Sequence, residues 1–359
     1  MILFILLFLI LYIGIQYLLE KRIYRSIARF HIPKRGFQAV FWLIALSYVL
    51  YQLFHAFLPK MIRVPLAYIG SYYLGFLFYC LLFFTICYFI HRFIKVKWDL
   101  YLLSLILIIG VIFPIGIYQQ HHILTKEYSV VSHKVDQDYT IALVTDLHLG
   151  DLIGTSRLNK MIDTINAAQP DLILIAGDLI DSDYAPVKEA DMLQNLTRLE
   201  SRLGVYVAMG NHDFYTGEIP EVKDELTRLG IHVLEDESVL LEDQLVITGR
   251  EDTSFNEKEL SSFIDTAQLG KFNIVMDHNP KRVRESVDLN VDMQVSGHTH
   301  NGQLYPLNYA IDILFEVGYG HRKIEQTDVF VSGGIGGWGP QLRTSSNAEF
   351  TLIHIEAED

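Results

Sequence analysis

The first third of the chain contains four long apolar stretches without Asp, Glu, Lys or Arg. They cover residues 1–19, 37–58, 66–90 and 100–118. Each approaches or exceeds the roughly 20 apolar residues that a helix needs to cross a 30 Å hydrocarbon core. Four buried helices of a soluble protein are the alternative, but the loops between these stretches hold nearly all the local charge. The pattern therefore predicts an all-α, four-helix transmembrane domain over residues 1–118.

The first apolar stretch is also long enough for a secretory signal peptide. Such a peptide has basic residues before its apolar segment and small residues at a cleavage site after it. Here Lys21, Arg22 and Arg25 follow the stretch, and no small-residue cleavage pattern comes after it. We therefore interpret residues 1–19 as a retained membrane span.

The loops between the spans differ in basic charge. The first and third loops together hold nine Lys and Arg residues, whereas the second holds only Lys60 and Arg63. Loops rich in Lys and Arg stay in the cytoplasm. With four spans, both termini are then expected outside the cytoplasm, in a protein integral to the cell membrane. Gain or loss of one span would invert this orientation.

The remainder of the chain has the composition of an acidic, water-soluble domain. Residues 119–359 hold 18 basic and 40 acidic side chains, whereas residues 1–118 carry a net charge of +9. No nucleic-acid partner is expected, because an acidic surface repels phosphate backbones. Residues 119–137 are interpreted as a linker with an edge strand, and residues 138–359 as a separate folded domain.

Short β-branched stretches alternate with amphipathic segments along this domain, which predicts an α/β fold. Expected strands cover residues 140–145, 172–176, 205–208, 231–234, 245–248, 273–276, 293–295, 329–331 and 350–355. Apolar residues at helical spacing predict helices around residues 158–165, 193–199, 222–229 and 260–264.

Polar clusters follow five of these strands directly. Their sequences are Asp146-Leu147-His148, Gly177-Asp178-Leu179-Ile180-Asp181, Gly210-Asn211-His212-Asp213, Asp277-His278-Asn279 and Gly297-His298-Thr299-His300. The carboxyl ends of strands are where sites assemble in open α/β sheets, so these clusters are expected to converge. Each cluster alone also fits a turn or a hydrogen-bonded histidine. Together they offer carboxylate, imidazole and carboxamide groups, which are metal ligands, and this part of the chain has no cysteine.

In this order, the clusters resemble the motifs of the calcineurin-like metallophosphoesterases, D-x-H, GD-x-x-D, GNH-[D/E], a lone His and GH-x-H, over about residues 138–357. The resemblance implies a two-sheet sandwich flanked by helices. It also implies two metal ions, one held by Asp146, His148 and His300. The second would be held by Asn211, His278 and His298, with Asp178 bridging the two. The segment His298–Gln303 further resembles that of a membrane-anchored branch of the family.

The chemistry of such a centre explains these residue types. Two divalent ions sharing a carboxylate and a water lower the pKa of that water, and the resulting bridging hydroxide attacks phosphorus. His212 matches the family's catalytic histidine and would act as general acid toward the leaving group. Asp181 is our candidate for orienting it, with Asp213 as the alternative. The mixed oxygen and nitrogen ligands suit Mn²⁺, Fe or Zn²⁺.

Two features near the C-terminus have open interpretations. The glycine-rich segment 333–339 is either a loop that approaches the substrate or a flexible turn. Arg343 could contact a phosphate, but we expect it on the surface.

These observations predict a membrane-anchored phosphoesterase that hydrolyses a phosphodiester or pyrophosphate bond, a preference taken from the family alone. Its location next to the lipid bilayer makes a lipid-linked substrate a natural expectation. One alternative is a cytoplasm-facing hydrolase of a UDP-diacylglucosamine type of pyrophosphate. Another is a sensor or scaffold that keeps the fold without turnover, although no expected ligand is missing and His212 is present.

Overall fold

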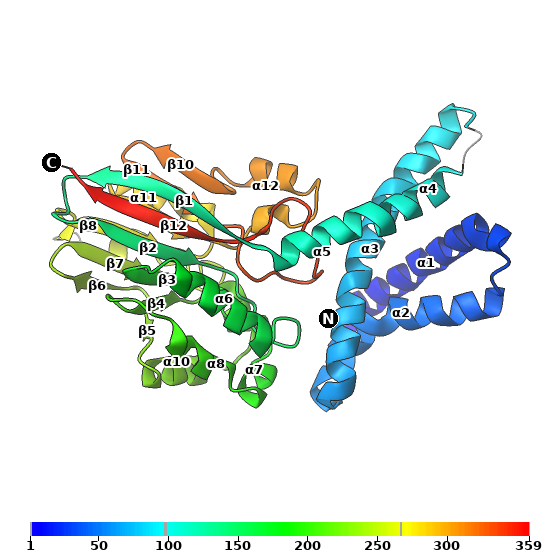
Figure 1. Ribbon diagram of the computed structural model, residues 1–359, viewed down its shortest axis with the longest axis horizontal. Helices are drawn as coiled ribbons and strands as arrows, with labels where there is room; N and C mark the ends of the chain where they lie inside the picture. The colour runs from blue at the N-terminus through cyan, green and yellow to red at the C-terminus, as the bar shows by residue number, and fades with distance from the viewer. Residues whose placement is uncertain (1, 97–98, 266–267, 359) are drawn as a thin grey trace. The chain divides into compact units, whose positions relative to one another are not determined.

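The computed structural model describes residues 2–96, 99–265 and 268–358, without the side chains of residues 2–6. The chain divides into two compact units (Figure 1). One contains residues 1–117 together with 339–342, and the other contains residues 118–338 and 343–359.

The first unit is entirely helical. Its helices are α1 (Ile2–Ile27), α2 (Lys34–Phe54), α3 (Lys60–Phe93), α4 (Leu100–Leu107) and α5 (Phe113–His121), of which α5 ends in the second unit. A π-helical turn, Ile108–Ile112, joins α4 to α5 just before Pro114. Proline has no backbone N–H to donate to the preceding turn, and such a turn accommodates that loss.

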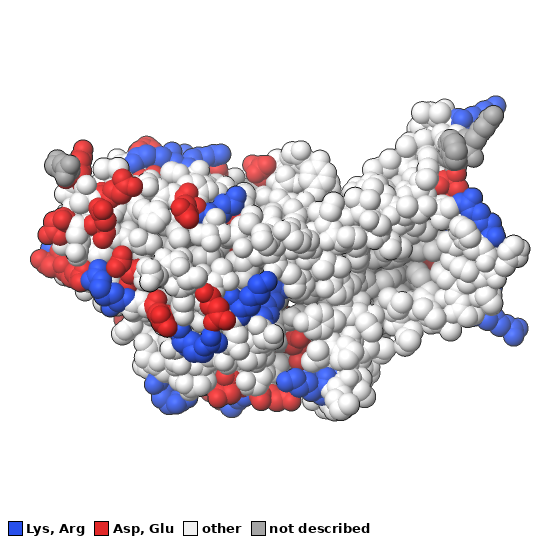
Figure 2. Space-filling model, viewed as in Figure 1, with Lys and Arg blue, Asp and Glu red and all other residues white. Residues whose placement is uncertain are grey.

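Three helical segments among the described residues are long and apolar enough to cross a membrane. They are Lys34–Phe57, Lys60–Phe93 and Leu100–His121, and they contain three of the four expected spans. Residues 2–19 of the remaining span belong to α1, but the span also includes residue 1 and the side chains of residues 2–6, which are outside the described part. Its membrane crossing stays a prediction. Figure 2 shows the visible surface of the helices as largely free of charge.

The second unit contains two six-stranded mixed sheets. The first has the order β1-β12-β2-β3-β4-β5, and the second has the order β10-β11-β9-β8-β7-β6. The strands of the first sheet are β1 (Ile123–Ser132), β2 (Tyr139–Val144), β3 (Leu172–Ala176), β4 (Val205–Ala208), β5 (His232–Val233) and β12 (Ala348–Ala357). Those of the second are β6 (Glu237–Leu241), β7 (Leu245–Gly249), β8 (Phe272–Met276), β9 (Met293–Ser296), β10 (Gly320–Ile324) and β11 (Thr327–Val331).

Alternation along the strands explains how the layers pack. In β2, Ile141 and Leu143 join the core between the two sheets, whereas Ala142 and Val144 face a second core under the helices. Successive side chains of a strand point to opposite faces, so a strand with apolar residues throughout is buried on both. The two-sheet α/β sandwich expected from the sequence is confirmed.

Helices cover the sheets and connect their strands (Figure 1). They are α6 (Thr155–Ala167), α7 (Ala185–Glu189), α8 (Met192–Asn195), α9 (Asn211–Tyr215), α10 (Ile219–Arg228), α11 (Val283–Asp288) and α12 (Asn308–Leu314). The helix expected at 260–264 is wrong, because only a 3₁₀ turn forms at Leu260–Ser262. The apolar side chains Leu260 and Ile264 still face the core there, and one turn is enough to bury both.

Candidate metal centre

The expected ligands follow the carboxyl ends of parallel strands in both sheets. Strands β2, β3 and β4 are parallel neighbours in the first sheet, and β8 and β9 are parallel neighbours in the second. The residues after these strands form three overlapping groups. Within each group, the ligand atoms all lie within 4.8 Å of one another. The groups are Asp146, His148 and His300; His148, Asp178 and His212; and Asp178, His278 and His298.

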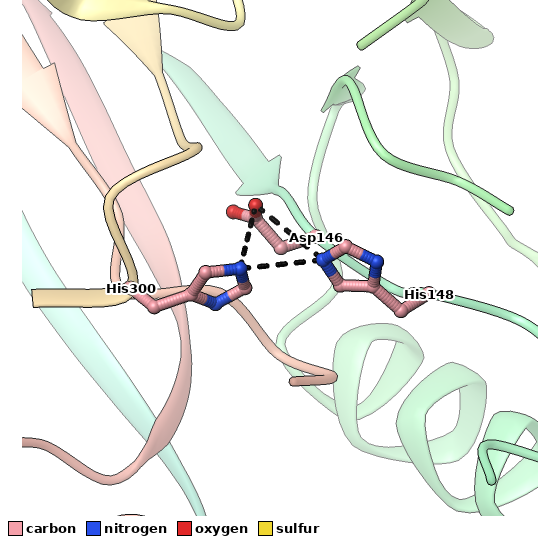
Figure 3. Close-up of side chains that lie close together, drawn as sticks. All are labelled: Asp146, His148 and His300. Atoms are coloured by element: carbon pink, nitrogen blue, oxygen red, sulfur yellow. Dashed lines mark hydrogen bonds and ion pairs between the residues drawn. The ribbon is translucent and has the colours of Figure 1, made fainter. Parts of the chain in front are cut away.

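The first group joins the two sheets (Figure 3). Nε2 of His148 lies 3.3 Å from Nε2 of His300, and Oδ1 of Asp146 lies 3.9 and 3.4 Å from these two atoms. All three side chains are buried. Their nitrogen and oxygen atoms therefore point at one shared position between β2 and β9.

The group of Asp178, His278 and His298 lies next to the first group, because its Asp178 also faces His148. Nε2 of His278 lies 3.2 Å from Oδ2 of Asp178. Nδ1 of His298 lies 2.9 Å from the carboxamide oxygen of Asn211, which places the expected ligand Asn211 beside this group.

Asp178 lies between the imidazole of His148 and the imidazole of His278. Its Oδ2 is 3.7 Å from Nε2 of His148 on one side and 3.2 Å from Nε2 of His278 on the other. Its Oδ1 accepts a hydrogen bond of 2.8 Å from the backbone N–H of His212. Asp178 therefore faces imidazoles of both sets of expected ligands, and its role as a bridging ligand stays a prediction.

The residues present fit divalent cations. Nδ1 of His278 lies 2.9 Å from the carbonyl oxygen of Ala176 and donates to it, so in the neutral ring the lone pair of Nε2 faces the Asp178 carboxylate. A lone pair facing a buried anion is unfavourable unless a cation or a proton lies between them. The donor set of carboxylate, imidazole and carboxamide oxygen and nitrogen suits divalent transition metals.

The backbone at this centre is held in an unusual conformation. Asp146, His148, Asp178, His298 and His300 all have positive φ, between 50° and 72°. Left-handed conformations are uncommon for residues other than glycine, and they concentrate at functional sites. Five of the seven expected ligands share this property, which supports a site assembled for binding.

Comparison with known proteins agrees with the geometry. The profile of the calcineurin-like phosphoesterase family matches residues 139–302. This region is a calcineurin-like metallophosphoesterase domain.

Curated relatives carry the same domain. A bovine transmembrane protein with a metallophosphoesterase domain is 30% identical over 60% of this chain and 53% of its own length. A metallophosphoesterase of Campylobacter jejuni is 30% identical over 65% of this chain and 63% of its own. One from Aquifex aeolicus is 28% identical over 67% of this chain and 94% of its own. The chain spans between about half and two thirds of the first two relatives. Transmembrane relatives and the three apolar helices together indicate a membrane protein.

Electrostatics favour the metal-binding forms of two of the expected ligands, His300 and Asp178. Burial lowers the pKa of His300 to about 3, so its imidazole is neutral at pH 7 and can offer a lone pair. Burial opposes ionisation of Asp178, but the neighbouring His278 and His148 hold the pKa of its carboxyl well below the usual range. A neutral imidazole and an ionised carboxylate are the forms that bind metals.

The structure distinguishes the two carboxylates considered as partners of His212. Oδ1 of Asp181 lies 3.4 Å from Nδ1 of His212, and the backbone carbonyl of Asp181 contacts the same nitrogen. Asp213 instead accepts backbone hydrogen bonds of 2.8 Å from both Ile180 and Gly210. Asp213 therefore holds two motif loops together, and Asp181 is the carboxylate beside the imidazole.

The glycine-rich segment packs against the first ligand segment. The N–H groups of Ile335 and Gly336 each donate a 3.0 Å hydrogen bond, to the carbonyl oxygens of Thr145 and Asp146 respectively. The ring of the neighbouring Trp338 lies 5.8 Å from that of His212. The segment is thus a packed wall of the metal centre rather than a free turn.

Arg343 differs from expectation, because it is completely buried. Its Nη1 donates a 2.7 Å hydrogen bond to the carbonyl of Gly333, and its Nε donates one of 3.0 Å to Oε1 of Gln120. Nη2 lies 3.5 Å from Nδ1 of His300. The guanidinium satisfies several acceptors of the glycine-rich segment, which explains why it is not on the surface.

A buried charged cluster lies behind His278 and was not predicted from the sequence. Arg250 contacts Asp277 at 3.3 Å and Glu285 at 3.0 Å, and Asp252 is fully buried nearby in the chain. Asp277 directly precedes His278, so this cluster braces the strand end that carries a ligand. A signal was present, since Arg250 and Asp252 follow the expected strand 245–248 just as the ligands follow theirs.

Proposed function

We propose that this chain is a membrane-anchored, dinuclear metal-dependent phosphoesterase that hydrolyses a phosphodiester or pyrophosphate bond. The observation that carries the proposal is the position of Asp178 between two groups of ligand atoms, 3.7 Å from His148 and 3.2 Å from His278. A single metal position would not need a carboxylate shared between two sets of imidazoles.

The proposed site would hold one ion between Asp146, His148 and His300, and another between Asn211, His278 and His298, with Asp178 between them. Mn²⁺, Fe and Zn²⁺ suit these donors. When bound, such ions neutralise charge on the phosphoryl oxygens and lower the pKa of an attacking water.

His212 is the proposed general acid. Burial alone would lower the pKa of His212, but the hydrogen bond with Asp181 and the negative charges of Asp178 and Asp181 raise it above the ordinary value. A raised pKa favours the protonated ring, which is the form that can give a proton to a leaving alkoxide. Asp181 is a positioning residue that holds the ring through Nδ1 and leaves Nε2 for the substrate.

The proposed substrate is a phosphoester presented at the bilayer, including lipid-linked phosphodiesters. This proposal is supported by the short connection between the two parts of the chain. Helix α5 ends at His121 and β1 begins at Ile123, so one residue separates the last apolar helical segment from the first strand of the catalytic domain. We propose that this domain faces the extracytoplasmic side, on the distribution of basic residues among the loops. A reporter fused after Asp359 tests this: an active exported phosphatase supports it, and cytoplasmic fluorescence alone contradicts it.

Hydrolysis of bis-p-nitrophenyl phosphate by the purified full chain with Mn²⁺ tests the reaction. We expect His212→Ala to lower kcat by about 10²–10⁴-fold, the usual contribution of a positioned general acid. His133→Ala is the matched control, because the His133 side chain is 80% exposed in the same domain. Equal rates for the wild type and His212→Ala would favour a non-hydrolytic sensor or scaffold.

A further inference from the structure

The segment from Gln303 to Phe315 exposes an unusual amount of apolar surface. It contains α12, a helix without a buried residue. Ile313 is 83% exposed and Leu314 is 72% exposed, although side chains of this kind are normally inside a folded domain. The exposed large apolar and aromatic side chains, which we call the α12 patch, are Tyr305, Leu307, Tyr309, Ile313 and Leu314.

Helical spacing gathers the patch on one side of α12. Tyr309 and Ile313 are four residues apart, and residues at that spacing are neighbours on a helix surface. Ile311 is half-buried, and its carbonyl accepts a 3.0 Å hydrogen bond from the N–H of Phe315. The side of α12 that carries Tyr309 and Ile313 is therefore exposed at the surface of the domain.

The segment that carries the α12 patch is next to the candidate metal centre at both of its ends. The segment starts directly after His300–Gly302 and returns at Phe315, whose ring lies 6.3 Å from that of His298. The side-chain amide of Gln303 makes two hydrogen bonds to the backbone of Trp338, at 2.7 and 3.2 Å. Trp338 is half exposed and its ring lies 5.8 Å from that of His212, so this aromatic side chain lies between the segment and the proposed general acid.

The chemistry of the patch matches a lipid surface. Segment 303–315 contains no Lys or Arg and only one acid, Asp312. Tyrosines are enriched at the level of the lipid headgroups, and isoleucine and leucine are favourable in the acyl region below them. Figure 2 shows the visible surface over α12 as largely white. Large exposed apolar patches mark sites of protein or membrane interaction.

The covalent structure favours lipid over a protein partner. The same chain contains three helical segments that are apolar enough to cross a membrane, and a single residue joins the last of them to β1. A bilayer is therefore always close to this domain, whereas a protein partner would have to be recruited. The patch has no array of charged or hydrogen-bonding side chains that would select a specific protein surface.

We propose that the α12 patch inserts into the interfacial region of the bilayer and turns the metal centre toward lipid. The catalytic domain would then have two attachments, the covalent one at His122 and a reversible one at α12. Delivery of a lipid-linked phosphoester to His212 follows if the proposed function is right, but the membrane contact itself does not depend on hydrolysis.

Lipid contact can be measured on the full chain in liposomes. A single cysteine replaces Ile313 in a background with Cys80→Ala and Cys87→Ala, and it carries an environment-sensitive fluorophore. Val131→Cys is the matched control, because Val131 is an apolar residue 59% exposed on β1, outside the patch. We expect nitroxide-labelled lipids to quench the probe at position 313 several-fold more strongly than at position 131.

Substitutions next to the probe test the cause. Leu314→Asp should reduce the quenching at position 313 to the level at 131, and Leu314→Met should retain it. Equal quenching at 313 and 131 would overturn the proposal. So would a water-shielded probe at 313 that nitroxide lipids do not quench, because a second copy of the chain or another protein would then cover α12. A chain without phosphoesterase activity would still give the quenching, so the two proposals fail separately.

Discussion

Oδ1 of Asp181 lies 3.4 Å from Nδ1 of His212, and it lies equally far from Nδ1 of His148. One carboxylate thus orients both the proposed general acid and a proposed metal ligand. Carboxylate–histidine pairs of this kind determine which ring nitrogen faces the reaction. Burial opposes its ionisation, but the two imidazoles beside it lower the pKa of Asp181 to about 2, so it remains charged across the working pH range.

Asp181→Asn should change the pH dependence of hydrolysis. Removing the carboxylate removes a cause of the raised pKa of His212, so that pKa falls. A general acid loses activity when it loses its proton, and the basic limb of the kcat profile therefore moves to lower pH. The profile is measured at saturating Mn²⁺, because His148 is affected too. Asp163→Asn, at an exposed site on α6, is the control. An unchanged basic limb in Asp181→Asn would contradict the role given to Asp181.

Gly297→Ala tests the close approach of two motif loops. A Cβ at position 297 would lie 2.4 Å from Oδ2 of Asp146 and 2.7 Å from Cβ of Thr145, so the first ligand would be displaced. We expect the free energy of unfolding to fall by about 1–3 kcal/mol, as for other overpacked sites, with lower metal occupancy. Gly270→Ala, in an exposed turn where nothing lies within 4 Å of the added carbon, should change stability by less than about 0.5 kcal/mol. Similar behaviour of the two variants would show that the site tolerates displacement.

Arg343→Lys should destabilise the catalytic domain although it keeps the charge. A lysine cannot reach the carbonyl of Gly333 and Oε1 of Gln120 with the fork of donors that the guanidinium provides. Leaving buried acceptors unpaired costs about 1–3 kcal/mol, which denaturant titration of the full chain in detergent would measure. Arg198→Lys, on a half-exposed arginine paired with Asp163, should be nearly neutral. A neutral Arg343→Lys would mean that these hydrogen bonds contribute little.

Much of the fold could be predicted from local sequence. Apolar stretches such as 172–176 and 273–276 form strands that are buried on both faces, and their composition does not suit a surface loop. Strands β6 and β10 were missed because both are sheet edges with mixed polar and apolar residues. Their pairing depends on the neighbouring strand, which local composition does not contain.

The candidate site was predictable where residue type and strand position coincide. Asp146 and His278 follow buried strands, and the structure brings them to one centre. The burial of Arg343 could not be predicted, because it depends on backbone carbonyls of the glycine-rich loop, whose conformation the sequence does not specify. Asp181 and Asp213 could not be separated either, because both are close to His212 and only the turn geometry decides which one faces the ring.

The metal content of the purified full chain tests the central claim most directly. Elemental analysis after removal of free metal should find two divalent ions per chain, and fewer than two in Asp178→Asn, because that side chain lies between both ligand groups. Hydrolysis should fall in parallel. An active wild-type chain that holds no divalent ion, or an Asp178→Asn variant that keeps both ions and full activity, would contradict the account.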